Sequence, residues 1–153
     1  TCFDSLKRTK IGSFFFARCT AEVGDFARAG DLFEKAFQIS NSLVEANWLR
    51  AESLAIAAHP DARAALKALP EDPDRDADRQ YIEGLCIESE GDLGAALDHY
   101  RKILSRAPNH PKSLFRLAYA LDLAAEDEMA VTAYQQCIER CGPIANALIK
   151  KHV

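Results

Sequence analysis

The 153-residue chain carries a formal net charge of -4, with 48% hydrophobic and 27% charged residues. This length allows one domain or one array of repeats, and the acidic balance argues against direct binding of a nucleic-acid backbone. No apolar run approaches the roughly 20 residues of a membrane span. Five cysteines without a framework spacing favour free thiols in a cytosolic protein.

The first half of the chain is predicted to hold two helix pairs. In the first, near residues 10–43, Gly24-Asp25 matches Gly91-Asp92 of a later unit, and Asp25 is placed as the N-cap of the second helix. The second, near residues 44–76, pairs a long helix with a short one that ends at Pro70. The acidic, proline-broken segment 71–79 is predicted as a loop.

The second half repeats one helix pair twice. Residues 77–110 and 111–144 align without a gap at a period of 34. Asp92, and Glu126-Asp127 in the last repeat, are placed to cap the second helices. Residues 1–9 and 145–153 extend the pattern as partial repeats or caps, so we expect a single array over 1–153 that is a fragment of a longer protein.

Small, aromatic and helix-ending residues recur at the same offsets in these units. They are Gly84-x2-Ile87, Ala96-x3-Tyr100 and Pro108, then Ala118-x2-Leu121, Ala130-x3-Tyr134 and Gly142-Pro143, and Gly24, Ala29-x3-Phe33 and Ala36 in the first unit. The pattern resembles the tetratricopeptide repeat (TPR); only Trp48 fits its tryptophan slot. The resemblance implies an all-α, right-handed α-solenoid of about four TPR-like helix-turn-helix repeats.

The resemblance also implies that the first helices line a concave groove that takes a partner peptide or helix. The expected groove residues are Phe14, Arg18, Trp48, Tyr81, Leu85, Phe115, Arg116 and Tyr119. Lys112 and Arg116 would add positive charge to this groove, and Glu88 and Asp122 negative charge deeper along it. The alternative is that the aromatic residues only pack one repeat on the next. Phe14 and Arg18 do not fit the clamp with which some TPR domains hold an acidic chaperone tail.

Catalytic and metal-binding patterns are not evident. Cys137 and Cys141 lie one helical turn apart, but a structural zinc site needs a second pair of ligands. None of the four histidines has a carboxylate or nucleophile partner at a spacing that indicates a triad. We therefore expect no enzyme activity, no cofactor and no metal.

The sequence thus favours a protein-interaction module, a scaffold or adaptor without direct contact to membrane or nucleic acid. Two alternatives stay open: self-association through terminal helices, and a scaffold for a catalytic or nucleic-acid-binding domain outside these residues. The run 115–149 more faintly resembles bacterial TPR segments that precede a domain similar to the C-terminal domain of the RNA polymerase α chain. This likeness favours a bacterial, cytoplasmic protein.

Overall fold

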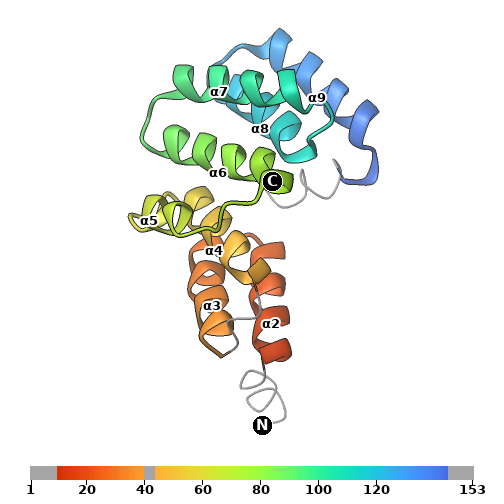
Figure 1. Cartoon of the computed structure of the whole chain (residues 1–153). Helices are drawn as coiled ribbons and strands as arrows, with labels where there is room; N and C mark the ends of the chain where they lie inside the picture. The colour runs from red at the N-terminus through yellow and green to blue at the C-terminus, as the bar shows by residue number, and fades with distance from the viewer. Residues whose placement is uncertain (1–9, 40–43, 145–153) are drawn as a thin grey trace. The chain divides into compact units, whose positions relative to one another are not determined.

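The computed structural model describes residues 10–39 and 44–144, and all regular structure in these two ranges is helical (Figure 1). In chain order the elements are α2 (Lys10–Glu22), α3 (Phe26–Ile39), α4 (Val44–Ile56), α5 (Ala62–Lys67), the 3-10 helix η1 (Pro73–Arg75), α6 (Asp76–Ser89), α7 (Leu93–Arg106), α8 (Pro111–Leu123) and α9 (Asp127–Cys141). The all-α expectation is confirmed. The partial repeats expected at 1–9 and 145–153 lie outside the described residues.

The chain divides into two compact units, residues 1–71 and 72–153. The division falls just after α5, which has 6 residues against the 14 residues of α3 and α7. Pro70 and Pro73 follow α5 closely, and proline cannot continue a helix. The break therefore coincides with the weakest of the predicted helix pairs, and the continuity of a single array across it stays a prediction.

The first unit is built on small residues that let its helices approach closely. Ala17 of α2, Ala29 of α3 and Ala46 of α4 are all fully buried and share a cluster with Phe33. A Cβ placed on Gly30 would lie 2.6 Å from a methyl carbon of Leu54. Larger side chains at these positions would force the helix axes apart.

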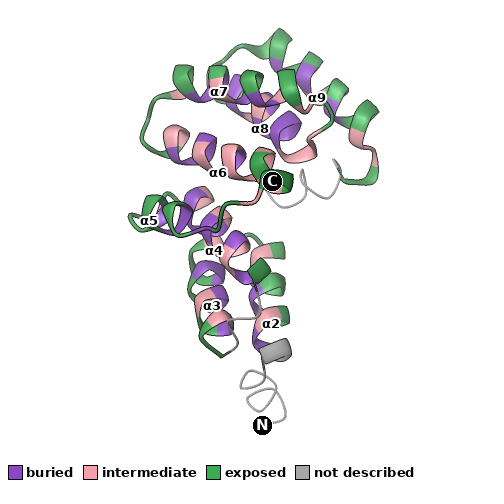
Figure 2. Ribbon diagram, in the orientation of Figure 1, coloured by how far each residue is buried: buried purple, intermediate pink, exposed green. Residues whose placement is uncertain are grey.

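Small residues also let the helices approach closely in the second unit, α6–α9. Ala96 and Ala130, one repeat apart, are 0% and 3% exposed, and Figure 2 shows that the buried faces of α6, α7 and α8 point inward. A Cβ on Gly84 would lie 2.5 Å from the Tyr100 ring. The small-residue and aromatic slots of the sequence pattern therefore serve helix packing, as the repeat predicts.

The helix-to-helix turns share one backbone conformation. Gly24, Ala58, Gly91 and Ala125 all have positive φ, between 52° and 94°, and they recur at intervals of 33 or 34 residues. In each repeat, the residue with this left-handed conformation follows the end of the first helix. Glycine adopts the conformation without strain. Alanine occupies it in two of the four turns.

Two of the three expected N-caps form. The Asp25 carboxylate accepts from the backbone N–H of Arg28 (3.3 Å), and that of Asp92 accepts from Ala95 (2.9 Å). Of the expected pair Glu126-Asp127, Glu126 precedes α9 without a side-chain cap bond, and Asp127 lies in the first turn of α9. The loop expected over 71–79 is also shorter, because η1 and the start of α6 occupy residues 73–79. Acidic residues in the first turn of α6 suit the positive end of a helix.

Candidate functional site

Most of the expected groove residues are core residues. Trp48 and Tyr81 are each 2% exposed, Leu85 is 1%, Phe115 is 3% and Arg116 is 8%. Side chains this deeply buried cannot offer a broad contact area to a partner. Their expected role as contact residues stays a prediction, and their burial favours a supporting role beneath the surface.

Three expected groove residues keep exposed surface. Phe14 and Tyr119 are half-buried, and Arg18 is exposed. The Phe14 ring packs edge-on against Phe33 with a centroid distance of 5.9 Å. Phe14 and Arg18 belong to the first unit and Tyr119 to the second, so each unit's surface is described by itself.

A buried ion pair lies behind the Tyr119 surface. Arg116 on α8 donates from Nε and Nη2 to the two carboxylate oxygens of Glu88 on α6, at 2.8 and 2.7 Å. The hydroxyl of Tyr100 on α7 also donates to Glu88, at 3.0 Å. Burial, reinforced by the negative charge of Glu88, raises the pKa of Tyr100 far above its ordinary value. Three helices therefore meet at one carboxylate.

This pair changes the expected electrostatics of the surface. We expected Arg116 and Glu88 to present opposite charges along a groove, but each side chain neutralises the other, at 9% and 8% exposure. The exposed charge that remains nearby on α8 is the carboxylate of Asp122.

Tyr119 is held from behind by this pair. Its ring centroid lies 4.6 Å from the Arg116 guanidinium carbon and 6.1 Å from the Phe115 ring in a stacked arrangement. Leu123, one helical turn later, is 56% exposed. A positioned aromatic ring beside an exposed aliphatic side chain is a surface that suits an apolar anchor of a partner.

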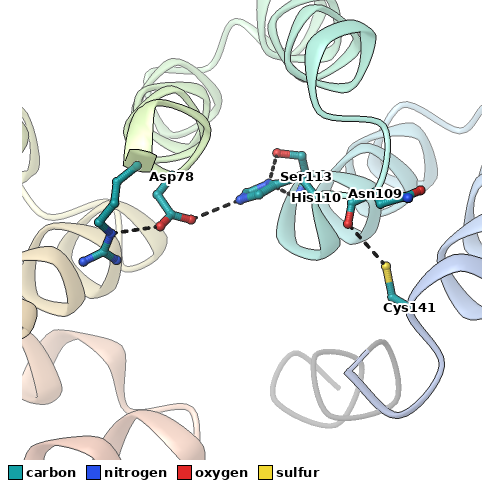
Figure 3. Close-up of polar contacts among 6 residues, drawn as sticks. Asp78, Asn109, His110, Ser113 and Cys141 are labelled. Atoms are coloured by element: carbon teal, nitrogen blue, oxygen red, sulfur yellow. Dashed lines mark hydrogen bonds and ion pairs between the residues drawn. The ribbon is translucent and has the colours of Figure 1, made fainter. Parts of the chain in front are cut away.

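A second polar cluster joins α6 to the start of α8 (Figure 3). His110 lies between Asp78, 3.1 Å from its Nε2, and the Ser113 hydroxyl, 2.8 Å from its Nδ1. The Arg75 side chain completes the cluster with a 3.1 Å bond to Asp78. Hydrogen bonding from His110 is the main cause that lowers the pKa of Asp78 to about 2.

This cluster has the residue types of a catalytic triad but not its accessibility. Ser113 is 0% exposed, so no substrate carbon can reach its hydroxyl. His110 instead caps α8, since its ring accepts from the Ser113 backbone N–H at 3.3 Å. The cluster corrects the expectation that no histidine has such partners. Its one local signal in the sequence was His110 three residues before Ser113 with proline between, an N-cap spacing.

The cysteine pair of α9 is a packing feature. Cys137 is 0% exposed, and burial raises the pKa of its thiol to about 11. The Cys141 thiol donates to the Asn109 carbonyl at 4.0 Å. In the described part of the chain no three His, Cys, Asp or Glu side chains are grouped as metal ligands. A small pocket of about 30 Å³ lies between α6 and α7, beside His99 and Lys102.

These features define a class, the helical-repeat solenoid proteins. Residues 112–141, which span nearly all of α8 and α9, match the family model of the tetratricopeptide repeat. The TPR is a non-catalytic fold that generally serves as a protein-interaction scaffold. None of the helices within residues 10–39 and 44–144 could span a membrane.

Solved structures share the fold. MamA residues 41 to the end from Desulfovibrio magneticus RS-1 is 19% identical with a TM-score of 0.56, covering 87% of this chain and 76% of that one. YrrB, described as a TPR protein with an unusual peptide-binding site, is 16% identical with a TM-score of 0.52, covering 99% and 96%. These identities support the helical-repeat solenoid fold alone.

One curated relative matches a shorter stretch. The Probable biofilm formation methyltransferase WspC of Pseudomonas putida is 46% identical over 50 residues. The match covers 33% of this chain and 11% of that protein, so this chain corresponds to only a small part of its length. The comparisons do not show the fainter likeness to segments that precede an RNA polymerase α C-terminal-like domain.

Proposed function

We propose that this chain is a protein-interaction module that binds a partner peptide or helix on the surface of its first helices. The observation that carries the proposal is the fixed position of Tyr119. Its ring rests on Arg116, and Arg116 is locked by two bonds to Glu88. A side chain held in this way loses little freedom on binding, which favours affinity.

The chemistry of this surface indicates the partner. Tyr119 and Leu123 offer an aromatic and an aliphatic contact, and the exposed carboxylate of Asp122 lies beside them on α8. We propose that the partner presents a large apolar side chain with a basic residue nearby. In the other unit, the half-buried Phe14 and the exposed Arg18 of α2 offer a second contact area that suits an apolar and acidic segment.

The test is a peptide selected from a displayed random library against the whole chain, with its dissociation constant measured by calorimetry. Tyr119→Ala removes the proposed anchor and should weaken binding at least tenfold, because hot-spot aromatics typically cost about 2 kcal/mol or more. Ile39→Ala is the control, since Ile39 is a large apolar residue 47% exposed on α3, a second helix outside the proposed surface. Equal affinity of wild type and Tyr119→Ala would reject the proposal.

A second candidate function is self-association, favoured by the outer face of α9. Val131 and Ile138 are 56% and 46% exposed. One repeat earlier, Leu97 and Leu104 hold the same register on α7, where Leu97 is buried and Leu104 packs on the core cluster of α8. Light scattering during gel filtration at several concentrations separates this candidate from a monomeric module. A mass that rises with concentration and returns to the monomer in Ile138→Asp supports it; a constant monomer mass rejects it.

A third candidate is a scaffold for a catalytic or nucleic-acid-binding domain elsewhere in a longer chain. The 46% identity to a stretch of a protein named as a methyltransferase motivates this candidate. Because that protein comes from a bacterium, the match also motivates the proposal that this chain is bacterial and cytoplasmic. The sequence of the full-length gene product tests both. A methyltransferase or other catalytic domain beside these residues supports this candidate, and an open reading frame limited to them rejects it.

A further inference from the structure

The His110 ring is engaged at both of its nitrogen atoms. Nδ1 lies 3.3 Å from the backbone nitrogen of Ser113 and 2.8 Å from its hydroxyl oxygen. Nε2 lies 3.1 Å from Oδ1 of Asp78 (Figure 3). One ring therefore caps α8 and connects it to the first turn of α6.

These contacts determine where the ring carries its proton. A backbone N–H only donates, so Nδ1 must present its lone pair to Ser113. The Asp78 carboxylate is ionised at neutral pH and only accepts, so Nε2 must carry the hydrogen. Both contacts select the neutral ring protonated on Nε2, and the Ser113 hydroxyl then donates to Nδ1 as well.

We propose that His110 is a proton-operated joint between the two helix pairs of the second unit: its ring bonds both α6 and α8, and its protonation state decides whether it caps α8. In the neutral state it caps α8 and holds α6. Proton uptake at Nδ1 keeps the bond from Nε2 to Asp78 and adds charge to it, but removes the acceptor of the Ser113 N–H. The joint then holds α6 without capping α8, and the first turn of α8 loosens.

The local sequence leaves α8 dependent on this cap. Pro111 at the first position of α8 has no N–H, and Ser113, whose N–H the ring accepts, is 0% exposed. Water therefore cannot readily replace the ring as acceptor. Histidine is also not among the residues that usually cap helices. An imidazole fits here because it has a second nitrogen that reaches Asp78.

The groups around the ring hold its two neighbours in place. Arg75 of η1 bonds the other carboxylate oxygen of Asp78 at 3.1 Å. The Tyr81 ring of α6 lies 6.0 Å from the imidazole, and Lys112 of α8 lies over that tyrosine. From α9, Arg140 and Cys141 donate to the carbonyl groups of Pro108 and Asn109, just before His110. Because these contacts do not use Nδ1, protonation removes the cap of α8 without breaking them.

The test is nitrogen-15 NMR of the whole chain, which reads the protonation of each histidine ring, combined with hydrogen exchange of the Ser113 amide. At neutral pH the His110 ring should show the form protonated on Nε2. On acidification the protection factor of the Ser113 amide should fall at least about tenfold, in step with proton uptake by His110. The contrary results are a ring protonated on Nδ1 at neutral pH, or unchanged Ser113 protection after the ring is protonated.

Two variants separate the joint from general acid effects. His110→Asn keeps a side chain that caps helices well but has no group that titrates, so its Ser113 protection should not follow pH. His99→Asn is the matched control, because His99 bonds the Gln80 carbonyl elsewhere between α6 and α7. It should retain the wild-type response of Ser113, and loss of that response would contradict the proposal. If His110→Asn fails to fold, the wild-type titration alone still tests whether protonation of His110 removes the cap of α8.

Discussion

Arg116 and Glu88 lie 28 residues apart and form two parallel hydrogen bonds of 2.8 and 2.7 Å between α8 and α6. Both side chains are less than 10% exposed. Removing water from two charges is costly, so the pair contributes less net stability than its geometry suggests. Its larger effect is that it connects α8 to α6 and holds the Arg116 guanidinium against the Tyr119 ring.

Removing one partner of this ion pair should strongly lower the free energy of unfolding. Arg116→Met leaves the Glu88 carboxylate buried without its counter-charge and should lower the free energy of unfolding by about 3–5 kcal/mol. Urea denaturation followed by circular dichroism measures this. Arg101→Ala breaks the exposed pair with Asp98 and should cost less than about 1 kcal/mol. Similar losses in the two variants would show that the buried pair is not special.

The close contact at Gly84 should be intolerant of a single methyl group. Gly84→Ala places a Cβ 2.5 Å from the Tyr100 ring, and such overpacking should destabilise the protein by about 1–3 kcal/mol in thermal or urea unfolding. Gly94→Ala in α7 is the control, since the nearest heavy atom would lie 3.8 Å away. We expect Gly94→Ala to be neutral or stabilising, by up to about 1 kcal/mol. If both variants lose stability, the helix propensity of alanine does not predict the effect of Gly94→Ala.

The repeated left-handed turn predicts two opposite effects. Ala125 has a φ of 58°, so Ala125→Gly should relieve strain and stabilise the protein by about 0.5–1 kcal/mol. Gly91 has a φ of 94° with no heavy atom near the site of a Cβ, so Gly91→Ala should destabilise it by about 1 kcal/mol through the backbone alone. Melting temperatures that move in the same direction would contradict this account.

Acid should weaken the contact between Asp78 and His110. The pKa of Asp78 is about 2 in the folded chain against 3.8 for the free side chain, so its stabilising effect is present above pH 4 and is lost as the pH falls through 2. The shift corresponds to about 2 kcal/mol. The stability difference between wild type and Asp78→Asn should therefore shrink between pH 5 and pH 2. A difference that stays constant over that range would show that the carboxylate charge is not involved.

Thiol reactivity should separate the cysteines by burial. Cys137 is fully buried with a pKa of about 11, whereas Cys19 is exposed on α2. Iodoacetamide at pH 8, followed by mass spectrometry of peptides, should label Cys19 much faster, because the thiolate is the nucleophile. Both should react at similar rates in urea. Rapid labelling of Cys137 in the folded protein would contradict its position in the core.

The sequence predicted the features that depend on local spacing. Ala96 and Ala130 mark the close helix contacts, and Asp92 is the expected cap, since small residues and caps act at fixed offsets within one repeat. The left-handed turn at Ala125 was not predicted, because alanine in a sequence does not indicate a positive φ, whereas a glycine such as Gly91 does.

The site was less predictable because it depends on contacts between repeats. Tyr81 and Phe115 share a slot with Phe14, but the slot alone does not tell whether packed neighbours cover it. The bonds from Glu88 to Arg116 and from Asp78 to His110 join residues 28 and 32 positions apart. Neither spacing follows a helical period, so a search along one helix face could not find them.

The proposed partner binds beside Tyr119 on α8, and amide NMR of the nitrogen-15-labelled whole chain, titrated with the tightest selected peptide, locates that contact. We expect the largest shift changes at Tyr119, Asp122 and Leu123, with Val131 and Ile138 on the outer face of α9 unchanged. Changes centred on Val131 and Ile138 with Tyr119 unmoved would contradict it.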